Sequence, residues 1–181
     1  LILQREIGSD SRSYVTGLSA ALKEDPDVIL VGELEDYETA ELAIKAAETG
    51  HLVLASVHTG SVLKTIERMI EIFPPHKKQQ VRAQMSEVLL GIISQQLLPK
   101  QGEKGRVAAY EVMIADANIR NLIRDSKNHQ IPSVMRNDAK EGMITMDEAI
   151  YNLYMKSSIN SETAIAYAED AADMRRKVEL F

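Results

Sequence analysis

Two ionisable side chains, Glu33 and His58, each follow an apolar run of the sequence. Residues 28–31 form an unbroken apolar run that Gly32 and Glu33 close, and a second run over residues 52–57 leads into His58. In open α/β sheets, ligands bind at the carboxyl ends of the strands, where we expect both residues to lie. Glu33 and His58 are therefore the first candidates for chemistry.

The position of Glu33 is typical of the acidic residue that closes a Walker B strand in nucleoside triphosphatases. Such a carboxylate orients water or holds Mg²⁺ during phosphoryl transfer. For Glu33 we expect the contact with Mg²⁺ to be made through a water molecule. His58, at the end of the next strand, is a candidate for contacting or sensing a γ-phosphate. From strand position alone, Glu33 is equally well interpreted as a solvated residue of a turn. For His58, strand position alone favours an ordinary loop histidine over a role in phosphate binding.

Two other kinds of site are not expected. His51 and His58 are separated by seven positions along a predicted strand, an odd number that points their side chains to opposite faces, so a two-histidine metal site is not favoured. Ser56 and His58 share a face, but the strained Gly-x-Ser-x-Gly turn of serine hydrolases is missing.

A βαβ unit must position these residues. The apolar run 28–31 predicts a strand buried on both faces of a parallel sheet. Asp36 and Glu38 place negative charge at the start of the next helix, where the helix dipole favours it, and Gly50 suits a left-handed C-terminal cap. A strand over residues 52–57 completes the unit, which we expect to have a right-handed crossover.

The rest of the chain predicts further elements from its periodicity and its Pro and Gly residues. Upstream we expect a strand over residues 1–6 and a helix over 11–23, capped by Ser11 or Asp10. After the βαβ unit we expect the following elements: a helix that ends at 74–75, a solvated helix start at 76–78, a long helix over 81–97, a turn at 101–105 and a strand over 107–113.

The character of the sequence changes near residue 115, after which short helices predominate. They are predicted over residues 118–125, 131–135, 145–154 and 161–168, and residues 174–181 are expected to fray. Thr145 and Glu148 form a capping-box pattern. We therefore predict two domains, an α/β core over residues 1–115 and a helical subdomain over 116–181. The methionines at positions 69, 85, 113, 135 and 146 fall on apolar stripes and are expected in the core.

Composition excludes several classes of protein. The chain has 181 residues, 45% of them hydrophobic, which is enough for one good core. A net charge of −6 argues against nucleic-acid binding through bulk charge. The chain has no cysteine, which excludes disulfides and thiolate zinc sites and is compatible with a reducing cytoplasm. No apolar run has the length of a membrane span. The first residue is Leu1, inside a predicted strand, so we expect a fragment of a longer protein.

Over residues 1 to about 150, the chain resembles the secretion and type IV pilus ATPases, because motifs of that family occur in order at the expected spacings. The matching segments are residues 4–6, 25–33, 46–51, 58–61, 64–68, 94–97, 105–111 and 119–124. The last of them, Ile-Arg-Asn-Leu-Ile-Arg, is most similar to the pilus retraction motors. The absence of cysteine agrees with a similarity to the retraction motors, since the secretion and pilus-extension members of the family usually carry a tetracysteine zinc insertion.

The resemblance implies a RecA-like ATPase core with a mainly parallel sheet and flanking helices, seen here as its C-terminal part. It implies a hexamer that uses ATP and Mg²⁺ at the cytoplasmic face of the inner membrane. There the hexamer would act on a pilus platform protein, without inserting into the membrane or binding nucleic acid, to drive pilus retraction and twitching motility.

By the same resemblance, Glu33 is the Walker B glutamate, and His51 and His58 belong to a histidine box. Thr59, His51 and Glu33 are implied in nucleotide binding. Three residues of the segment 119–124 are implied in coupling the motor to its partner: Arg120, Asn121 and Arg124.

Four positions depart from the family. Leu34-Glu35-Asp36 stands where Met-Arg-Asp is usual, so an anion replaces a cation, and Gly60 and Tyr110 also differ from the usual residues. No Gly-x-x-x-x-Gly-Lys-[Ser/Thr] loop occurs, so the phosphate cradle is expected upstream of Leu1 and the chain alone is expected to be inactive. The alternatives are a type II secretion or pilus-extension ATPase and, in another class, a non-catalytic assembly module.

Overall fold

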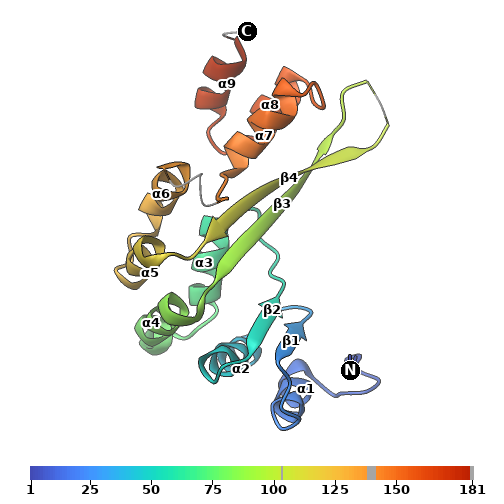
Figure 1. Cartoon of the computed structure of the whole chain (residues 1–181), viewed down its shortest axis with the longest axis vertical. Helices are drawn as coiled ribbons and strands as arrows, with labels where there is room; N and C mark the ends of the chain where they lie inside the picture. The colour runs from blue at the N-terminus through green and yellow to red at the C-terminus, as the bar shows by residue number, and fades with distance from the viewer. Residues whose placement is uncertain (103, 138–141, 180–181) are drawn as a thin grey trace. The chain divides into compact units, whose positions relative to one another are not determined.

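The computed structural model describes residues 1–102, 104–137 and 142–179 as an α/β chain (Figure 1). The predicted fold class is confirmed. The chain divides into two compact units: residues 1–58 with 67–89, and residues 59–66 with 90–181. We call these the first and the second unit. Among the described residues, no helix is both long and apolar enough to cross a membrane.

The first unit contains the predicted βαβ arrangement. Strand β1 (Val28–Val31) pairs in parallel with β2 (Leu52–Ala55), and helix α2 (Tyr37–Glu48) connects them. The helix begins where the sequence predicts, with Asp36 as its N-cap. It ends ahead of Gly50, whose φ of +100° is in the left-handed region that favours glycine.

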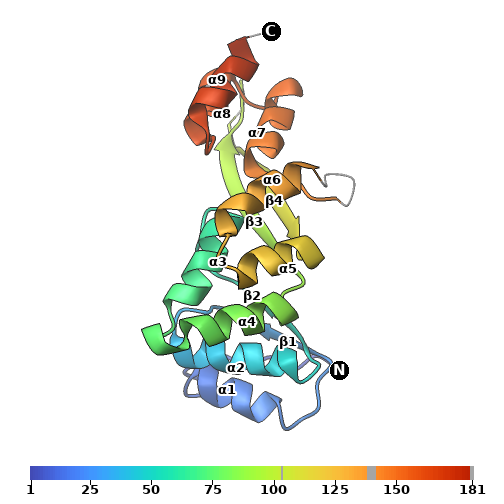
Figure 2. The same ribbon diagram turned by 90° about the vertical axis from the view of Figure 1, so that its left-hand side faces the viewer.

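Helices α1 (Tyr14–Ala21) and α4 (Lys78–Val88) both pack against α2 (Figure 2). A short 3₁₀ turn, η1 (Pro75–Lys77), precedes α4 and agrees with the predicted helix start there. The Nζ atom of Lys77 lies 2.6 Å from Oε1 of Glu41 on α2. These contacts fix α2 against its neighbours within the first unit.

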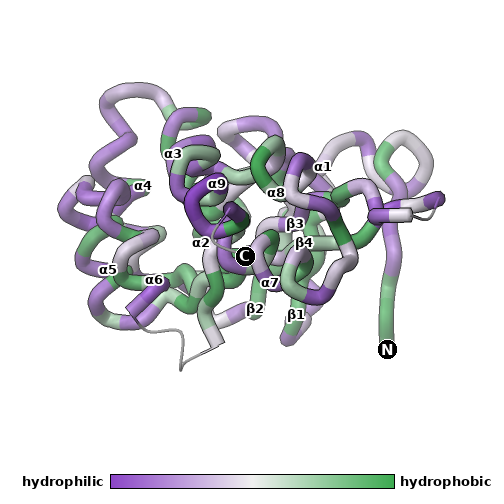
Figure 3. The backbone as a smooth tube through the Cα atoms, turned by 90° about the horizontal axis from the view of Figure 1, so that it is seen from above, coloured by the Kyte–Doolittle hydropathy of each residue, from purple (hydrophilic) through white to green (hydrophobic). Residues whose placement is uncertain are grey.

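One face of the β1–β2 pair is apolar and exposed. Ile29 and Val31 are buried, whereas the exposed fractions of Leu30 and Leu54 are 75% and 50%. The alternation follows from the two-residue period of a strand. The prediction that residues 28–31 are buried on both faces is therefore wrong for this structure, because the described residues cover only one face. Both strands are hydrophobic throughout (Figure 3).

The second unit is built on a long antiparallel hairpin of β3 (Gly91–Pro99) and β4 (Arg106–Ile114), in register from Gly91 opposite Ile114 to Pro99 opposite Arg106. Its other elements are α5 (Ala117–Arg124), η2 (Asn128–Gln130), α6 (Ile131–Asn137), α7 (Met146–Met155), α8 (Ser161–Tyr167) and α9 (Ala171–Glu179). Helix α3 (Val62–Glu71) begins in this unit and ends in the first one.

The core of the second unit joins the hairpin to the three C-terminal helices. Leu98 of β3 and Ala109 of β4 pack with residues of α7, α8 and α9, which lie along the loop half of the hairpin (Figure 1). The predicted capping box of Thr145 and Glu148 starts α7. The five methionines predicted to be in the core are all buried, each at most 8% exposed.

Several predicted elements are wrong. No strand forms over residues 1–6, which are exposed and have no partner strand among the described residues. The cap of α1 is Ser13, whose side chain accepts the Thr16 N–H, rather than Ser11 or Asp10. Residues 174–179 do not fray but belong to α9, where Met174 is buried.

The long helix predicted over residues 81–97 is also wrong, since the chain changes there from α4 to β3. Leu89 is already extended, with ψ of 125°, and a Cβ on Gly91 would lie 2.8 Å from the carbonyl oxygen of Met113. From Gly91 onward burial alternates, with Ser94 buried and Ile93 exposed, because one face of the hairpin packs on the core.

Two predictions extend beyond the described residues. The turn at 101–105 includes Glu103, and the predicted fraying includes residues 180–181, all of which lie outside the described part of the chain. The domain boundary near residue 115 stays a prediction. In the structure, β4 and the helices after residue 115 are in the same compact unit.

Candidate functional site

The structure brings Glu33 and His58 together at the carboxyl ends of β1 and β2. In the register of the pair, Val31 lies opposite Ala55, so the residues that follow the two strands lie at the same end of the sheet. There Nε2 of His58 lies 2.5 Å from Oε1 of Glu33. Backbone contacts hold the two turns together, since the N–H of Leu34 donates to the carbonyl of Ser56 at 3.0 Å.

The pair is open to solvent. The side chains of His58 and Glu33 are 76% and 38% exposed. The hydrogen bond to Glu33 raises the pKa of His58, as do the charges of Glu33 and Glu35. Glu33 therefore stabilises the protonated form of the His58 ring relative to its neutral form.

Glu35 completes a group of three side chains that offer ligand atoms within 4.8 Å of one another: Glu33, Glu35 and His58. Carboxylate oxygens suit Mg²⁺, which usually keeps several waters and takes one or two carboxylates. The residues therefore fit the predicted role of Glu33 in holding Mg²⁺ through water. The same carboxylate is placed to accept a proton from, or to orient, a water molecule at this edge.

His51 is at the opposite end of β2 from His58, immediately before Leu52. Its Nδ1 atom lies 3.0 Å from the carbonyl oxygen of Ala46 and 3.3 Å from Oγ1 of Thr49. These contacts place it at the turn between α2 and β2, and the structure does not bring it to Glu33. Its part in nucleotide binding stays a prediction.

Thr59 belongs to the second unit. Its hydroxyl lies 2.6 Å from the hydroxyl of Thr65, which donates to the carbonyl of Ser61 at the start of α3. Thr59 thus takes part in ordering the first turn of that helix, and its predicted contact with nucleotide stays a prediction.

The three residues predicted to couple the motor lie on α5. Ile119 and Ile123 are fully buried and fix one face of this helix. Arg120 is partly buried, with its Nε donating to the carbonyl of Ala115 at 2.8 Å, whereas Asn121 and Arg124 are exposed. Arg124 is in the last turn, where the helix dipole favours a cation.

Sequence reasoning assigned no role to Glu111, a buried carboxylate in β4 that is only 3% exposed. It accepts the backbone N–H of Val62 at 2.7 Å. The sequence offered one signal for a role of Glu111. It is an acidic residue in a strand that is otherwise mostly apolar, and it lies in segment 105–111, which resembles the family.

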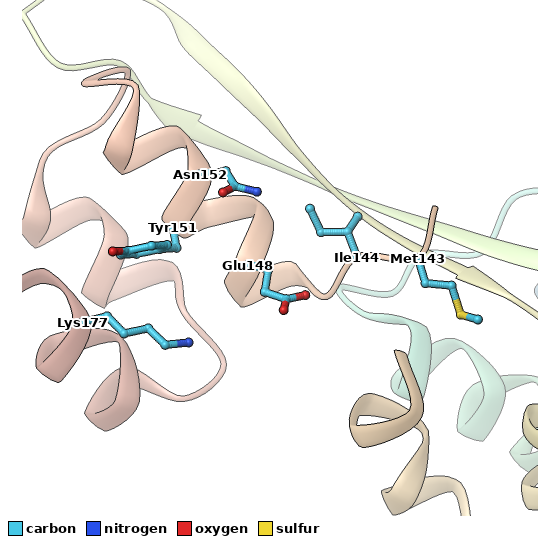
Figure 4. Close-up of a pocket in the computed structure, with 6 residues that line it drawn as sticks. All are labelled: Met143, Ile144, Glu148, Tyr151, Asn152 and Lys177. Carbon is cyan, nitrogen blue, oxygen red and sulfur yellow. The ribbon is translucent and has the colours of Figure 1, made fainter. Parts of the chain in front are cut away.

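A hollow in the second unit is a weaker candidate (Figure 4). It is lined by Met143, Ile144, Glu148, Tyr151, Asn152 and Lys177. Its charged groups serve the fold: Glu148 accepts from Thr145 in the capping box, and Lys177 pairs with Asp173 at 2.9 Å. The residues that line this hollow do not indicate which ligand it would bind.

Comparison with known proteins gives consistent results. The profile of the family described as "Type II/IV secretion system protein" matches residues 7–157. The "Twitching motility protein" of Neisseria gonorrhoeae is 45% identical over 174 residues, which is 96% of this chain and 46% of that protein. The "Type IV pilus retractation ATPase PilT" of Pseudomonas aeruginosa is 47% identical over 164 residues, or 91% of this chain and 47% of that protein.

A solved structure, described as "Crystal Structure of the Pilus Retraction Motor PilT and Bound ADP", matches with a TM-score of 0.87 at 47% identity. The match covers 96% of this chain and 49% of that one. The chain therefore spans about half the length of the relatives that it matches.

Proposed function

The chain belongs to the type II/IV secretion system protein family, and from this premise we propose that it is the C-terminal portion of a motor that hydrolyses ATP to retract type IV pili. We call the longer polypeptide the parent motor. The observation that carries the proposal is the Glu33–His58 pair, 2.5 Å apart at the carboxyl edge of two parallel strands. The relatives named for twitching motility and pilus retraction support the choice of pilus system.

In this proposal Glu33 orients the water that attacks the γ-phosphate. His58 holds the Glu33 carboxylate in place and contacts the phosphate when nucleotide binds, and Thr59 and His51 contribute to the nucleotide site. Glu33 would hold Mg²⁺ through water, and the bound ion would neutralise part of the phosphate charge. A solved relative that carries ADP supports nucleotide use.

The phosphate cradle must come from another part of the parent motor, since this sequence has no P-loop. The exposed apolar face of β1 and β2 is where other elements of the parent motor would pack, because an exposed apolar surface is unfavourable in water. For the chain alone, we expect no steady ATP hydrolysis. We expect it to bind nucleotide with a millimolar dissociation constant at best, which is a binding free energy of about −4 kcal/mol. Micromolar affinity in calorimetry would contradict it.

The proposal places the parent motor as a hexamer on the cytoplasmic side of the inner membrane, against a platform protein of the pilus machine. The surface of α5 that carries Asn121 and Arg124 is proposed to transmit force, with Arg120 beside it. Burial of Ile119 and Ile123 supports this assignment, because it holds the opposite face of α5 rigidly in the core.

Arg124→Glu in the parent motor tests the assignment to retraction. Arg124 is chosen because its side chain is exposed, whereas Arg120 is partly buried. The expected result is weakened twitching motility with ATP hydrolysis within about twofold of the unmodified motor, because an exposed charge contributes little to the fold. Arg136→Glu is the matched control, since Arg136 is also a cation in the last turn of a helix, α6. Normal motility in the Arg124→Glu strain would exclude this surface from force transmission.

A further inference from the structure

We propose that Glu111 is a positioning residue that anchors the segment following His58, with its carboxyl group placed at the N-terminus of helix α3. The inference rests on the proposed role of His58 in hydrolysis. It assigns a role to a buried acidic residue that the site at Glu33 and His58 does not use.

Glu111 lies on the face of β4 that packs on the core, and its side chain reaches the first residue of helix α3. Its Oε2 accepts the N–H of Val62, the first residue of α3, at 2.7 Å. N-terminal N–H groups have no partner inside their own helix, and the helix dipole favours an acidic group there. Glu111 thus satisfies such a group on an element that precedes it by 49 positions in the sequence.

The surroundings of Glu111 are those of a structural anchor rather than of a free acid. Burial raises the pKa of its carboxyl group, as do the charges of Glu169 and Asp147, while the N–H groups of Val62 and Met146 act in the opposite direction. Asp147 is itself engaged, since its carboxylate accepts the N–H groups of Glu169 at 2.7 Å and Asp170 at 3.0 Å.

The segment that Glu111 anchors begins one residue after His58. Within residues 59–66, the hydroxyl of Thr65 bonds both Thr59 and Ser61, and the side chain of Gln96 reaches the carbonyl of Gly60 at 3.4 Å. The division between the compact units falls between His58 and Thr59. The start of α3 is four peptide bonds from His58 and therefore limits how far the backbone of His58 can lie from it.

Two substitutions separate anchoring from simple destabilisation. Glu111→Met keeps the approximate size of the side chain and removes both acceptor oxygens, whereas Glu111→Gln keeps one acceptor. The matched control is Glu148→Met, which removes the capping-box acceptor of Thr145 at the start of α7 and leaves the Val62 contact intact.

The first measurement is amide hydrogen exchange in the chain itself. In Glu111→Met, exchange at Val62 is expected to speed up by about tenfold or more, because a buried donor loses its acceptor. Glu111→Gln and Glu148→Met should leave exchange at Val62 within about threefold of the unmodified chain. Equal rates at Val62 in Glu111→Met and Glu148→Met would overturn the anchoring.

The second measurement is steady-state ATP hydrolysis by the parent motor. Glu111→Met is expected to lower kcat by about tenfold with KM within about twofold, since a displaced His58 affects the chemical step more than binding. Rescue by Glu111→Gln is part of the expected result. A kcat equal to that of Glu148→Met would overturn the positioning role. An unmodified parent motor without hydrolysis would refute the proposed function instead, and the exchange measurement would still decide the anchoring.

Discussion

Replacing Asp36 by alanine should loosen helix α2, which begins four residues after Glu33. Asp36 accepts two hydrogen bonds from Thr39: Oδ1 takes the backbone N–H at 2.8 Å, and Oδ2 takes the hydroxyl at 2.7 Å. Thr39 is fully buried, so its hydroxyl has no water to replace the lost acceptor.

The magnitude follows from these two contacts. Loss of an N-cap costs about 1 kcal/mol, and a stranded buried hydroxyl adds about 1 kcal/mol or more. A total of about 2 kcal/mol corresponds to roughly 30-fold faster amide exchange in α2, if those amides exchange by local opening of the helix. In Asp36→Ala/Thr39→Val no hydroxyl is stranded, so the acceleration should fall to about fivefold to tenfold.

Hydrogen exchange followed over α2 measures this effect without requiring both units to unfold together. The matched control is Asn160→Ala, which removes a single exposed cap bond, Thr163 N–H to Oδ1 at 2.8 Å, at the start of α8. It should accelerate exchange in α8 by only about fivefold, from a loss of about 1 kcal/mol. Exchange in α2 of Asp36→Ala within about threefold of the unmodified chain would refute the reasoning.

The same cap predicts a pH dependence. The N–H of Thr39 lowers the pKa of Asp36 below its ordinary value of 3.8, and the Thr39 hydroxyl lowers it further. Since the folded pKa is depressed, the stabilisation is complete well above pH 3.8 and is lost as the pH falls through the folded value. After correction for intrinsic exchange rates, the unmodified chain should therefore approach Asp36→Ala only in acid.

Two further substitutions test the packing of each unit. Gly91→Ala places a Cβ 2.8 Å from the carbonyl oxygen of Met113 and should destabilise the β3–β4 hairpin by about 2 kcal/mol; unchanged amide exchange in the hairpin would contradict that contact. Lys77→Met removes an ion pair with Glu41 at 2.6 Å and a cation–π contact with Tyr37 at 4.8 Å. Because Lys77 and Glu41 are 29% and 46% exposed, thermal unfolding should show a loss of no more than about 1 kcal/mol, and a larger loss would mean that the pair is better shielded than its exposure indicates.

The βαβ unit was predictable because its signals are local. An apolar run, an acidic helix start at Asp36 and a glycine suited to positive φ at Gly50 each act over a few residues. The pairing of Glu33 with His58 followed from the same unit, since parallel strands bring their carboxyl ends to one edge.

Strand β4 was predicted, over residues 107–113, but strand β3 was not predictable from periodicity because its apolar pattern continues that of α4. Val81, Met85 and Val88 recur at helical spacing, and Ile92 extends that series into β3. What ends the helix is long-range pairing, in which the backbone of Met113 approaches Gly91 too closely for a side chain. The role of Glu111 was hidden for the same reason, since Val62 precedes it by 49 positions in the sequence.

The most direct test of the central claim is ATP turnover by the parent motor carrying Glu33→Gln. If Glu33 orients the attacking water, ATP binding should persist while kcat falls by about 100-fold or more. Glu38→Gln is the matched control, because Glu38 is an exposed acidic residue of the same unit that lies outside the group of Glu33, Glu35 and His58, so its kcat should stay within a few-fold of the unmodified motor. A Glu33→Gln motor that turns over ATP within a few-fold of the unmodified protein would contradict the assignment of Glu33 as the catalytic carboxylate.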